Sequence, residues 1–178
     1  KACVFTSAAS DPALDDTNTL TAGLIEKNWP QVITVMTCSR SETLGNLSTF
    51  GIDGGISTTD LQMGLLVQEL EDPGIYQVYR ELSSNSGGNQ IYISHSTVGS
   101  WGENAQNFSF GCLKIAATQL NLPVEILGIQ KTSNEKPILN PENKLVLGSI
   151  DHIVYMARKR FDWLGNSSKV LEQIKKLA

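Results

Sequence analysis

Residues 1–82 alternate between short apolar segments and segments with helical spacing, and this alternation constrains the fold more than any other feature. Three runs, residues 2–6, 32–36 and 52–57, favour β-strand, and each is followed by a segment whose apolar residues recur with a helical period. Apolar strands that are linked by helices form parallel sheets covered on both faces. We therefore expect an α/β fold that begins with a β-α-β-α-β-α unit, whose last helix is interrupted at Pro73.

The order of these segments is that of the C-terminal half of a Rossmann-like parallel sheet. A dinucleotide-binding fold opens with a strand, a GxGxxG turn and a helix, and this sequence has no such motif. Gly51, Gly54 and Gly55 lie just before or at the start of a strand and are interpreted as a turn. Ser39 or Ser41 is expected to cap the second helix, and the 58–60 segment the third.

A run rich in serine, glycine and asparagine, residues 83–89, is predicted to be a linker between two domains. Beyond it, short strands, one helix and polar turns indicate a small α+β lobe over residues 90–160. The expected domains are completed by residues 1–82 before the linker and by a tail, residues 161–178, with an amphipathic helix. Within the second lobe we expect strands at 90–94, 124–130, 137–139 and 150–157, and a helix at 108–119.

Charge and composition narrow the class of function. A net charge of −4 without a basic stripe argues against a nucleic-acid partner. Basic residues gather only near the end, starting with Arg158, Lys159 and Arg160, which predicts a solvated face or else a membrane-surface or partner contact. The three cysteines show no pairing pattern, which fits a reducing compartment. No apolar stretch reaches about 18 residues, so we expect any membrane-spanning part to lie outside this chain.

The second lobe carries a resemblance to a known family. Residues 126–129, 138–141 and 147–155 resemble the hydrophobic–glycine–hydrophobic strand, the Asn-Pro turn and the glycine–aspartate–strand pattern of the C-terminal lobe of RCK domains, the regulators of potassium conductance. Together with the half-Rossmann unit, the resemblance spans about residues 2–158. Two further segments are similar to the large-conductance calcium-activated channels and their relatives, namely residues 10–18 and 88–92.

This resemblance implies a gating-ring domain of a potassium channel, at the cytoplasmic face of the membrane, that senses a ligand and is not an enzyme. RCK domains form homo-oligomers, as dimers or as a ring of commonly eight domains, so the implied partners are other RCK domains and a pore domain. Ligand binding would change the angle between the lobes and act on the pore. The helix–turn–helix over 61–82 would cross to a partner domain. The alternative within this fold is a nucleotide-sensing regulatory subunit of a Trk-type potassium uptake system.

Ligands of open α/β sheets bind outside the carboxyl ends of the strands. Asp11, Asp15 and Asp16 place three carboxylates near one such end, and Ca²⁺ prefers oxygen-rich clusters. The resemblance implies Asp16 and Gln90 as metal ligands, with Asp11 beside them, although Gln90 stands where the family has a glutamate and supplies no charge. The other interpretation is that the aspartates cap a helix and complement its dipole.

A nucleotide is the second ligand that we expect. Ser7 and Ala8 are small residues that would allow close approach of NAD or an adenine nucleotide held mainly by a glycine-rich half outside this sequence, or they simply make room for packing. Asp53 and the acidic residues near Glu69 are interpreted as solvated surface charge, with a cation site as the alternative.

Two functions of other classes are weighed against the channel hypothesis. The C-terminal part of an NAD-dependent oxidoreductase would need a histidine or lysine beside an orienting carboxylate. His95 and His152 have no such pairing and no nucleophile motif nearby. A purely structural assembly module would show no ligand-dependent change in melting temperature.

Overall fold

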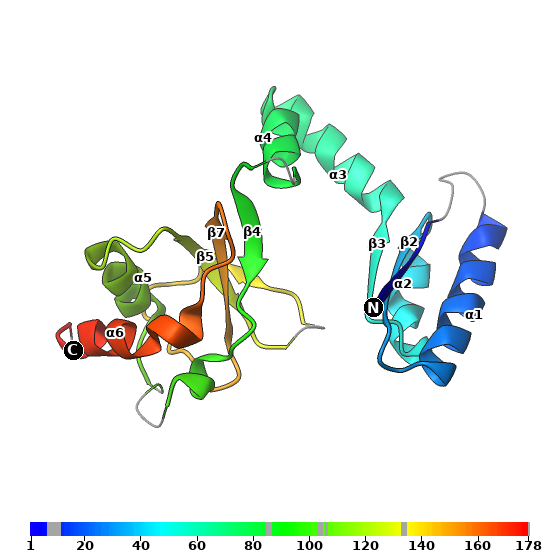
Figure 1. Cartoon of the computed structure of the whole chain (residues 1–178). Helices are drawn as coiled ribbons and strands as arrows, with labels where there is room; N and C mark the ends of the chain where they lie inside the picture. The colour runs from blue at the N-terminus through cyan, green and yellow to red at the C-terminus, as the bar shows by residue number, and fades with distance from the viewer. Residues whose placement is uncertain (7–11, 85–86, 103–104, 106, 133–134, 178) are drawn as a thin grey trace. The chain divides into compact units, whose positions relative to one another are not determined.

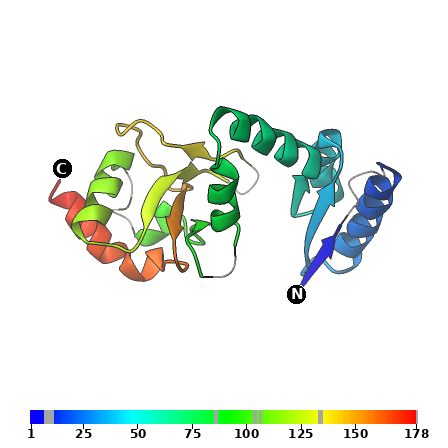
Figure 2. The same cartoon turned by 90° about the horizontal axis from the view of Figure 1, so that it is seen from above.

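The chain divides into two compact units, Lys1–Tyr76 and Gln77–Ala178, and each contains its own sheet (Figures 1 and 2). The structure is a computed structural model, and it describes residues 1–6, 12–84, 87–102, 105, 107–132 and 135–177. The first sheet is parallel and the second is antiparallel, which confirms the expected α/β class with a small α+β lobe. None of the helices in these ranges is long and apolar enough to span a membrane.

The first unit is a three-stranded parallel sheet with helices on one face. Side chains of partnered residues in parallel strands point to the same side, so Met36 and Cys38 of the central strand face the same way as their partners. On this side Met36 and Cys38 are fully buried with Ala22 and Leu47 in one small core. The strand order in the sheet is β1-β2-β3. Along the chain, the elements of this unit up to the last strand are β1 (Ala2–Phe5), α1 (Pro12–Asn28), β2 (Ile33–Cys38), α2 (Ser41–Leu47), a 3₁₀ turn (Ser48–Phe50) and β3 (Gly54–Ser57).

The other face of this sheet is apolar and open within the described part of the chain. Val4, Ile33 and Ile56 point to this side and are 65%, 57% and 49% exposed. The sequence pattern predicted helices on both faces, and the structure has them on one. Since parallel sheets are normally buried on both sides, the open face is suited to packing against a further layer.

Two helices follow the sheet, α3 (Thr58–Glu71) and α4 (Ile75–Leu82). The residue that caps α3 is Ser57, whose Oγ accepts a hydrogen bond from the Asp60 N–H at 3.2 Å, so the expected cap at 58–60 is wrong by one residue. The chain bends between the helices at Gly74, which has a φ of +101°. No residue of α3 is buried, and its exposed apolar side chains are Leu61, Met63, Leu66, Val67 and Leu70.

The second unit is an antiparallel sheet, and two helices pack against one of its faces. Gly128 lies where this sheet needs close strand contact, because a Cβ at this position would overlap the Ile138 carbonyl. Between the expected strand at 90–94 and the expected helix at 108–119, the chain contains a 3₁₀ turn, Val98–Trp101. The strand order is β4-β7-β5-β6, and the elements are β4 (Gln90–Ile93), α5 (Phe110–Gln119), β5 (Glu125–Gln130), β6 (Ile138–Leu139), β7 (His152–Ala157) and α6 (Trp163–Lys175).

The core of the second unit is built around aromatic rings. Tyr92 stacks on Tyr155 with 5.6 Å between ring centroids, and Tyr155 meets Trp163 edge to face at 5.5 Å. Trp163 in turn stacks on Trp101 at 5.8 Å, and Trp101 on Phe108 at 6.3 Å. The final helix, α6, was expected as a tail, but it supplies three buried side chains to this core, namely Trp163, Val170 and Ile174.

Candidate functional site

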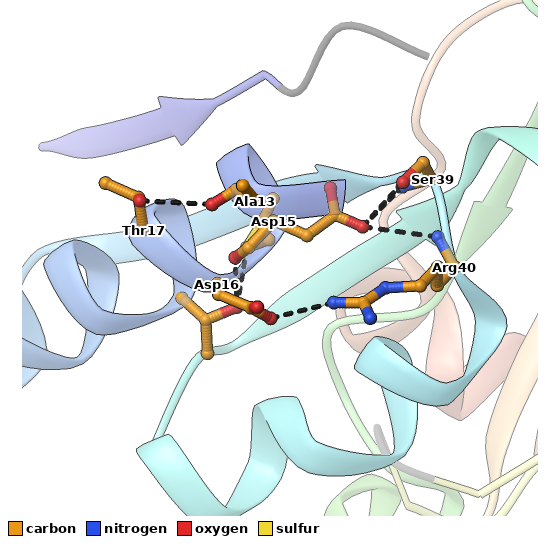
Figure 3. Close-up of polar contacts among 8 residues, drawn as sticks. Ala13, Asp15, Asp16, Thr17, Ser39 and Arg40 are labelled. Atoms are coloured by element: carbon orange, nitrogen blue, oxygen red, sulfur yellow. Dashed lines mark hydrogen bonds and ion pairs between the residues drawn. The ribbon is translucent and has the colours of Figure 1, made fainter. Parts of the chain in front are cut away.

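The candidate site lies at the carboxyl end of β2, where the first turn of α1 meets the loop that leads into α2 (Figure 3). We call it the strand-end site, and it is the location that the α/β rule predicts for a ligand. The residues that form it are Asp15, Asp16, Ser39, Arg40, Ser41 and Asp60.

Asp15 holds the β2–α2 loop in place. Its carboxylate is fully buried, and its Oδ2 accepts three hydrogen bonds, from the Ser39 N–H at 2.9 Å, the Ser39 hydroxyl at 2.8 Å and the Arg40 N–H at 3.2 Å. Ser39 was one of two residues expected to cap α2, but it does not do so, because its hydroxyl donates to Asp15. Ser41 is also not the cap, since α2 begins after Arg40 without a side-chain cap.

Asp16, the next residue, forms an ion pair at the surface. Its Oδ1 lies 2.8 Å from Nη2 of Arg40, and the side chains of Asp16 and Arg40 are 72% and 44% exposed (Figure 3). This pair borders a cavity of about 420 Å³ between α1 and α2. The cavity is lined by Asp16, Thr19, Leu20, Arg40, Glu42, Thr43, Asn46 and Phe50.

The first turn of α3 also forms hydrogen bonds with the β2–α2 loop and the end of β2. The Thr58 hydroxyl donates to the Cys38 carbonyl at 3.2 Å, and the Thr59 hydroxyl donates to the Ser39 carbonyl at 2.7 Å. The Ser41 hydroxyl donates to Oδ1 of Asp60 at 2.7 Å. These contacts join two segments about 20 residues apart in the chain, so the loop is a preformed scaffold.

Cys38 lies at the end of β2 inside this network and does not have the character of a nucleophile. Burial raises the pKa of its thiol, and the negative charges of Asp15 and Asp60 raise it further. Its Sγ lies 3.7 Å from the Ile56 carbonyl, to which the thiol donates. The site therefore offers hydrogen-bonding and ionic groups for binding, and Cys38 stays a neutral thiol.

The residues predicted from the sequence as ligands are placed as follows. Ser7, Ala8 and Asp11 lie outside the described residues, so their predicted contacts with a nucleotide or metal stay predictions. Asp16 lies on α1 in the first unit, whereas Gln90 is the first residue of β4 in the second.

Gln90 is engaged locally. Its Nε2 donates to the Ser84 carbonyl at 2.9 Å, and its Oε1 accepts from the Tyr92 hydroxyl at 2.7 Å. Across the part of the chain that the structure describes, no group of three or more His, Cys, Asp or Glu side chains could hold a metal ion. Asp16 and Gln90 lie in different units, so their predicted role as metal ligands stays a prediction.

Other carboxylates and histidines that the sequence singled out have structural contacts. Oδ2 of Asp53 accepts from the Thr34 N–H at 2.7 Å, so Asp53 is more than a solvated charge. Oε1 and Oε2 of Glu69 accept from the N–H groups of Gly74 and Tyr76, both at 2.8 Å, which ties the end of α3 to the first turn of α4. Nδ1 of His152 lies 2.7 Å from the Ser94 carbonyl.

Sequence reasoning did not single out Arg40. Its partner Asp16 lies 24 residues away, and the two meet only because α1 and α2 cover the same face of the sheet. The sequence signal that points to this pair is a basic residue two positions after a strand, together with aspartates at the start of the preceding helix.

Comparisons with known proteins give no family by sequence. No family model matches the chain. No curated protein matches it either. Among solved structures it is similar to the GsuK channel bound to NAD, to the GsuK channel and to the GsuK RCK domain, with 13% identity in each case and TM-scores of 0.35, 0.34 and 0.35.

These alignments cover 98–99% of this chain but only 27%, 28% and 33% of the respective matched chains. The chain therefore spans about a third or less of the length of the structures it matches. At this identity and these TM-scores, the similarity by itself establishes neither family membership nor function.

Proposed function

We propose that this chain is part of an RCK-type regulatory domain, which couples ligand binding to the opening of a potassium channel. The observation that carries the proposal is the location of the residues that match the RCK pattern. Residues 126–129 lie in β5, 138–139 in β6 and 152–155 in β7, which are adjacent strands of one sheet. The three matching segments thus belong to one sheet, as expected if they form a single RCK-type C-terminal lobe.

The first unit supports the proposal through its open face. Three parallel strands with helices on one side are half of a doubly wound sheet. A glycine-rich half, supplied by residues outside this sequence, would add strands beside β1. Its helices would cover Val4, Ile33 and Ile56.

The exposed side of α3 supports an oligomer as the working form. Leu66 and Leu70 are 60% and 84% exposed, and Leu61 and Met63 are at least half exposed. Burying one such side chain stabilises a complex by up to about 1.5–3 kcal/mol. The partner that we propose is a second RCK domain, in a dimer or in an octameric ring at the cytoplasmic face of a potassium channel.

A nucleotide is the ligand that the first unit suits better. Among the described residues, the Asp16 carboxylate pairs with Arg40, and Oε1 of Gln90 accepts a hydrogen bond from the Tyr92 hydroxyl. NAD or an adenine nucleotide would bind at the carboxyl end of the parallel sheet, with its phosphates on the glycine-rich half. We propose that the site acts by binding and conformational coupling rather than by catalysis. Burial and the charges of Asp15 and Asp60 raise the pKa of the Cys38 thiol, so Cys38 is not suited to act as a nucleophile.

Self-association tests the oligomer. Light scattering after size exclusion should give an oligomer for the parent chain and a monomer for the double variant Leu66→Ser/Leu70→Ser. Ile115→Ser is the control, because Ile115 is also an exposed apolar residue of a helix, 48% exposed on α5 of the other unit. A parent chain that stays monomeric at high concentration, or a control that dissociates equally, contradicts the role of α3.

The regulatory function needs the native membrane protein that carries this domain. Rubidium flux into liposomes should change when NAD⁺, ADP, ATP or Ca²⁺ is added, and calorimetry on the same protein should identify which of them binds. Steady-state oxidation of NAD(P)H would instead assign an oxidoreductase. Flux that none of the ligands alters, together with no calorimetric binding, would leave a structural assembly module.

A further inference from the structure

The strand β4 leaves one edge of the second sheet free. It is the first strand in the order β4-β7-β5-β6 and pairs with β7 alone (Figure 1). In an antiparallel pair the N–H and C=O groups of one residue point to the same side, and this side alternates along the strand. The Ser94 N–H donates to the Ile153 carbonyl of β7 at 2.9 Å, so Ser94 and Tyr92 face β7. The backbone groups of Ile91 and Ile93 therefore point to the free edge.

This edge is open to a further strand. Within the part of the chain that the structure describes, the Ile91 N–H, the Ile91 carbonyl and the Ile93 N–H take part in no hydrogen bond outside the sheet. Unpaired backbone groups of this kind are a template for pairing with another chain. Proteins usually prevent such pairing with charged residues or proline in the edge strand, and β4, with the sequence Gln-Ile-Tyr-Ile, has neither.

The two faces of β4 differ in what they offer to an added strand. Tyr92 stacks on Tyr155 against the core of the unit. Ile91 and Ile93 point to the opposite face and are 50% and 42% exposed. Side chains on neighbouring strands pack directly against each other, and branched apolar residues suit such positions. An added strand should therefore place apolar side chains beside Ile91 and Ile93.

Arg160 brings a positive charge to the same edge. Its Nη1 donates to the Ile93 carbonyl at 2.9 Å, and its guanidinium lies 5.0 Å from the centroid of the Tyr92 ring. Arg160 is exposed and forms no ion pair with a described residue. A carbonyl oxygen has two lone pairs, so Ile93 can also accept an N–H of an added strand. Opposite charges on neighbouring strands stabilise their pairing, so this edge favours a strand that carries a carboxylate.

Two cavities flank Arg160 and leave room for side chains on the Tyr92 side of the strand. One has a volume of about 790 Å³ and is lined by residues 95–97, which follow β4. The other has a volume of about 610 Å³ and is lined by Asn89, which precedes β4. Arg160 and Phe161 line both. A strand added beside β4 would therefore extend from one cavity to the other, with Arg160 near its middle.

A carboxylate in each cavity determines where the acidic residue of the added strand belongs. Asp162 lines the larger cavity and caps α6, where its Oδ1 accepts the Gly165 N–H at 2.9 Å. Glu125 lines the smaller cavity. Both negative charges disfavour an acidic side chain at either end of the added strand. The favoured position is the centre, opposite Tyr92 and beside Arg160.

We propose that the free edge of β4 binds an extended segment of a partner protein with the pattern apolar–acidic–apolar, which adds to the sheet as an antiparallel strand. The acidic side chain faces Arg160, and the apolar side chains lie beside Ile91 and Ile93. The strand pairs of this sheet are antiparallel, and antiparallel pairing is the more stable per residue. The site lies in the second unit and does not depend on the nucleotide proposed above.

A second copy of this chain does not provide such a segment. The pattern apolar–acidic–apolar occurs in the sequence at residues 124–126 and 161–163. The first segment leads into β5, and the second leads into α6 with Trp163 in the core. Both are already part of the fold of the second unit, so the partner is a different protein.

The test is a titration of the full chain with the capped peptide Ser-Thr-Val-Glu-Val-Thr-Ser, followed in ¹H–¹⁵N NMR spectra. In the free chain the amides of Ile91 and Ile93 should exchange rapidly with solvent, whereas the Tyr92 amide, which faces β7, should be protected. Saturating peptide should protect Ile91 and Ile93 and leave Tyr92 unchanged. This alternation along three consecutive residues distinguishes strand addition from other modes of binding.

Changes in the peptide test each contact without altering the protein. N-methylation of either valine keeps the side chain but removes an N–H that faces β4, and should raise the Kd about tenfold. N-methylation of the glutamate is the matched control and should raise the Kd far less, because that N–H faces away from β4. Replacing the glutamate with glutamine should raise the Kd about fivefold, as expected for the loss of an exposed ion pair.

A protein variant assigns the ion pair to Arg160. In Arg160→Gln the glutamate and glutamine peptides should bind equally, with the Kd of the glutamate peptide raised about fivefold. Lys169→Gln makes the same change of charge at an exposed position of α6 and should preserve the preference for glutamate.

Several results would overturn the proposal. These are amides of Ile91 and Ile93 that stay unprotected at saturating peptide, equal Kd values for the peptides methylated at valine and at glutamate, or a preference for glutamate that persists in Arg160→Gln. Amides of Ile91 and Ile93 that are protected without peptide and lose this protection on dilution would assign the edge to a second copy and refute the proposal as well. If Arg160→Gln fails to fold, the comparison of the methylated peptides still decides the matter.

Discussion

Two consecutive aspartates offer a sharp test of how burial governs the contribution of a carboxylate. Asp15 is fully buried and accepts three hydrogen bonds from the β2–α2 loop, whereas Asp16 makes one surface ion pair with Arg40. The perturbation is Asp15→Ala, compared with Asp16→Ala. Each variant removes one carboxylate near the start of α1, Asp15 in the first turn or Asp16 directly after it.

The expected magnitudes differ several-fold. Asp15→Ala leaves two backbone N–H groups and the Ser39 hydroxyl without their acceptor, and each loss costs about 1–3 kcal/mol. Since such costs are not additive for groups that share one partner, we expect the first unit to lose about 3–5 kcal/mol of its free energy of unfolding. Asp16→Ala should cost at most about 1 kcal/mol, because exposed ion pairs contribute little.

The assay must follow the two units separately, because a single unfolding free energy is defined only for a two-state transition. Urea unfolding monitored by ¹H–¹⁵N spectra resolves signals of the first unit from those of the second. The amides of Ser39 and Arg40 should also exchange with solvent much faster in Asp15→Ala than in the parent chain. Equal losses of stability in the two variants, or a loss below about 1 kcal/mol for Asp15→Ala, would refute the reasoning.

Three further outcomes follow from the structure. Hydrogen bonds from the N–H groups of Tyr76 and then Gly74 lower the pKa of Glu69 from its ordinary 4.5, so the tie between α3 and α4 should persist above about pH 4.5 and be lost as the pH falls through the lowered pKa. Glu69→Gln should remove this pH dependence from the exchange rate of the Tyr76 amide, and a dependence that survives would contradict the assignment. Gly128→Ala should destabilise the second unit by about 2–3 kcal/mol in urea, because the added Cβ overlaps the Ile138 carbonyl. Gly45→Ala, inside α2 with open space around it, should stabilise the first unit by about 0.5–1 kcal/mol, and a loss from Gly45→Ala as large as that from Gly128→Ala would show that glycine removal itself is the cause.

The order of strands and helices follows from local patterns, and sequence analysis predicted it well. Apolar runs gave β2 and β7 to within two residues at each end, since alternation and helical spacing are properties of neighbouring residues. The bend between α3 and α4 followed from Pro73 and Gly74 in the same way. Such elements depend on interactions within about one turn or one strand.

The candidate site depended on contacts that no local pattern contains. Ser39 has the residue type and position of a helix cap, but its hydroxyl bonds to Asp15, which is 24 residues earlier. Asp16 forms an ion pair with Arg40, which is likewise 24 residues away in the chain. In both cases the tertiary fold brings a stronger partner than the local one, and a single sequence does not identify it.

The burial of part of the final helix was also not predicted from the sequence. Its basic residues indicated a solvated tail, and Lys169, Lys175 and Lys176 are indeed exposed. The four residues that face the core, Trp163, Ser167, Val170 and Ile174, recur at helical spacing. That periodicity was present in the sequence, but the start of the helix at Trp163 was not recognised because Asp162 caps it without a following glutamate.

The row of aromatic rings in the second unit has a mechanical consequence. The rings of Tyr92, Tyr155, Trp163 and Trp101 pack one against the next. They form a continuous row of contacts between the edge strand β4 and the last helix, α6. Close-packed interiors transmit displacement rather than absorb it. We therefore expect a displacement of β4 to reach α6 through this row of rings.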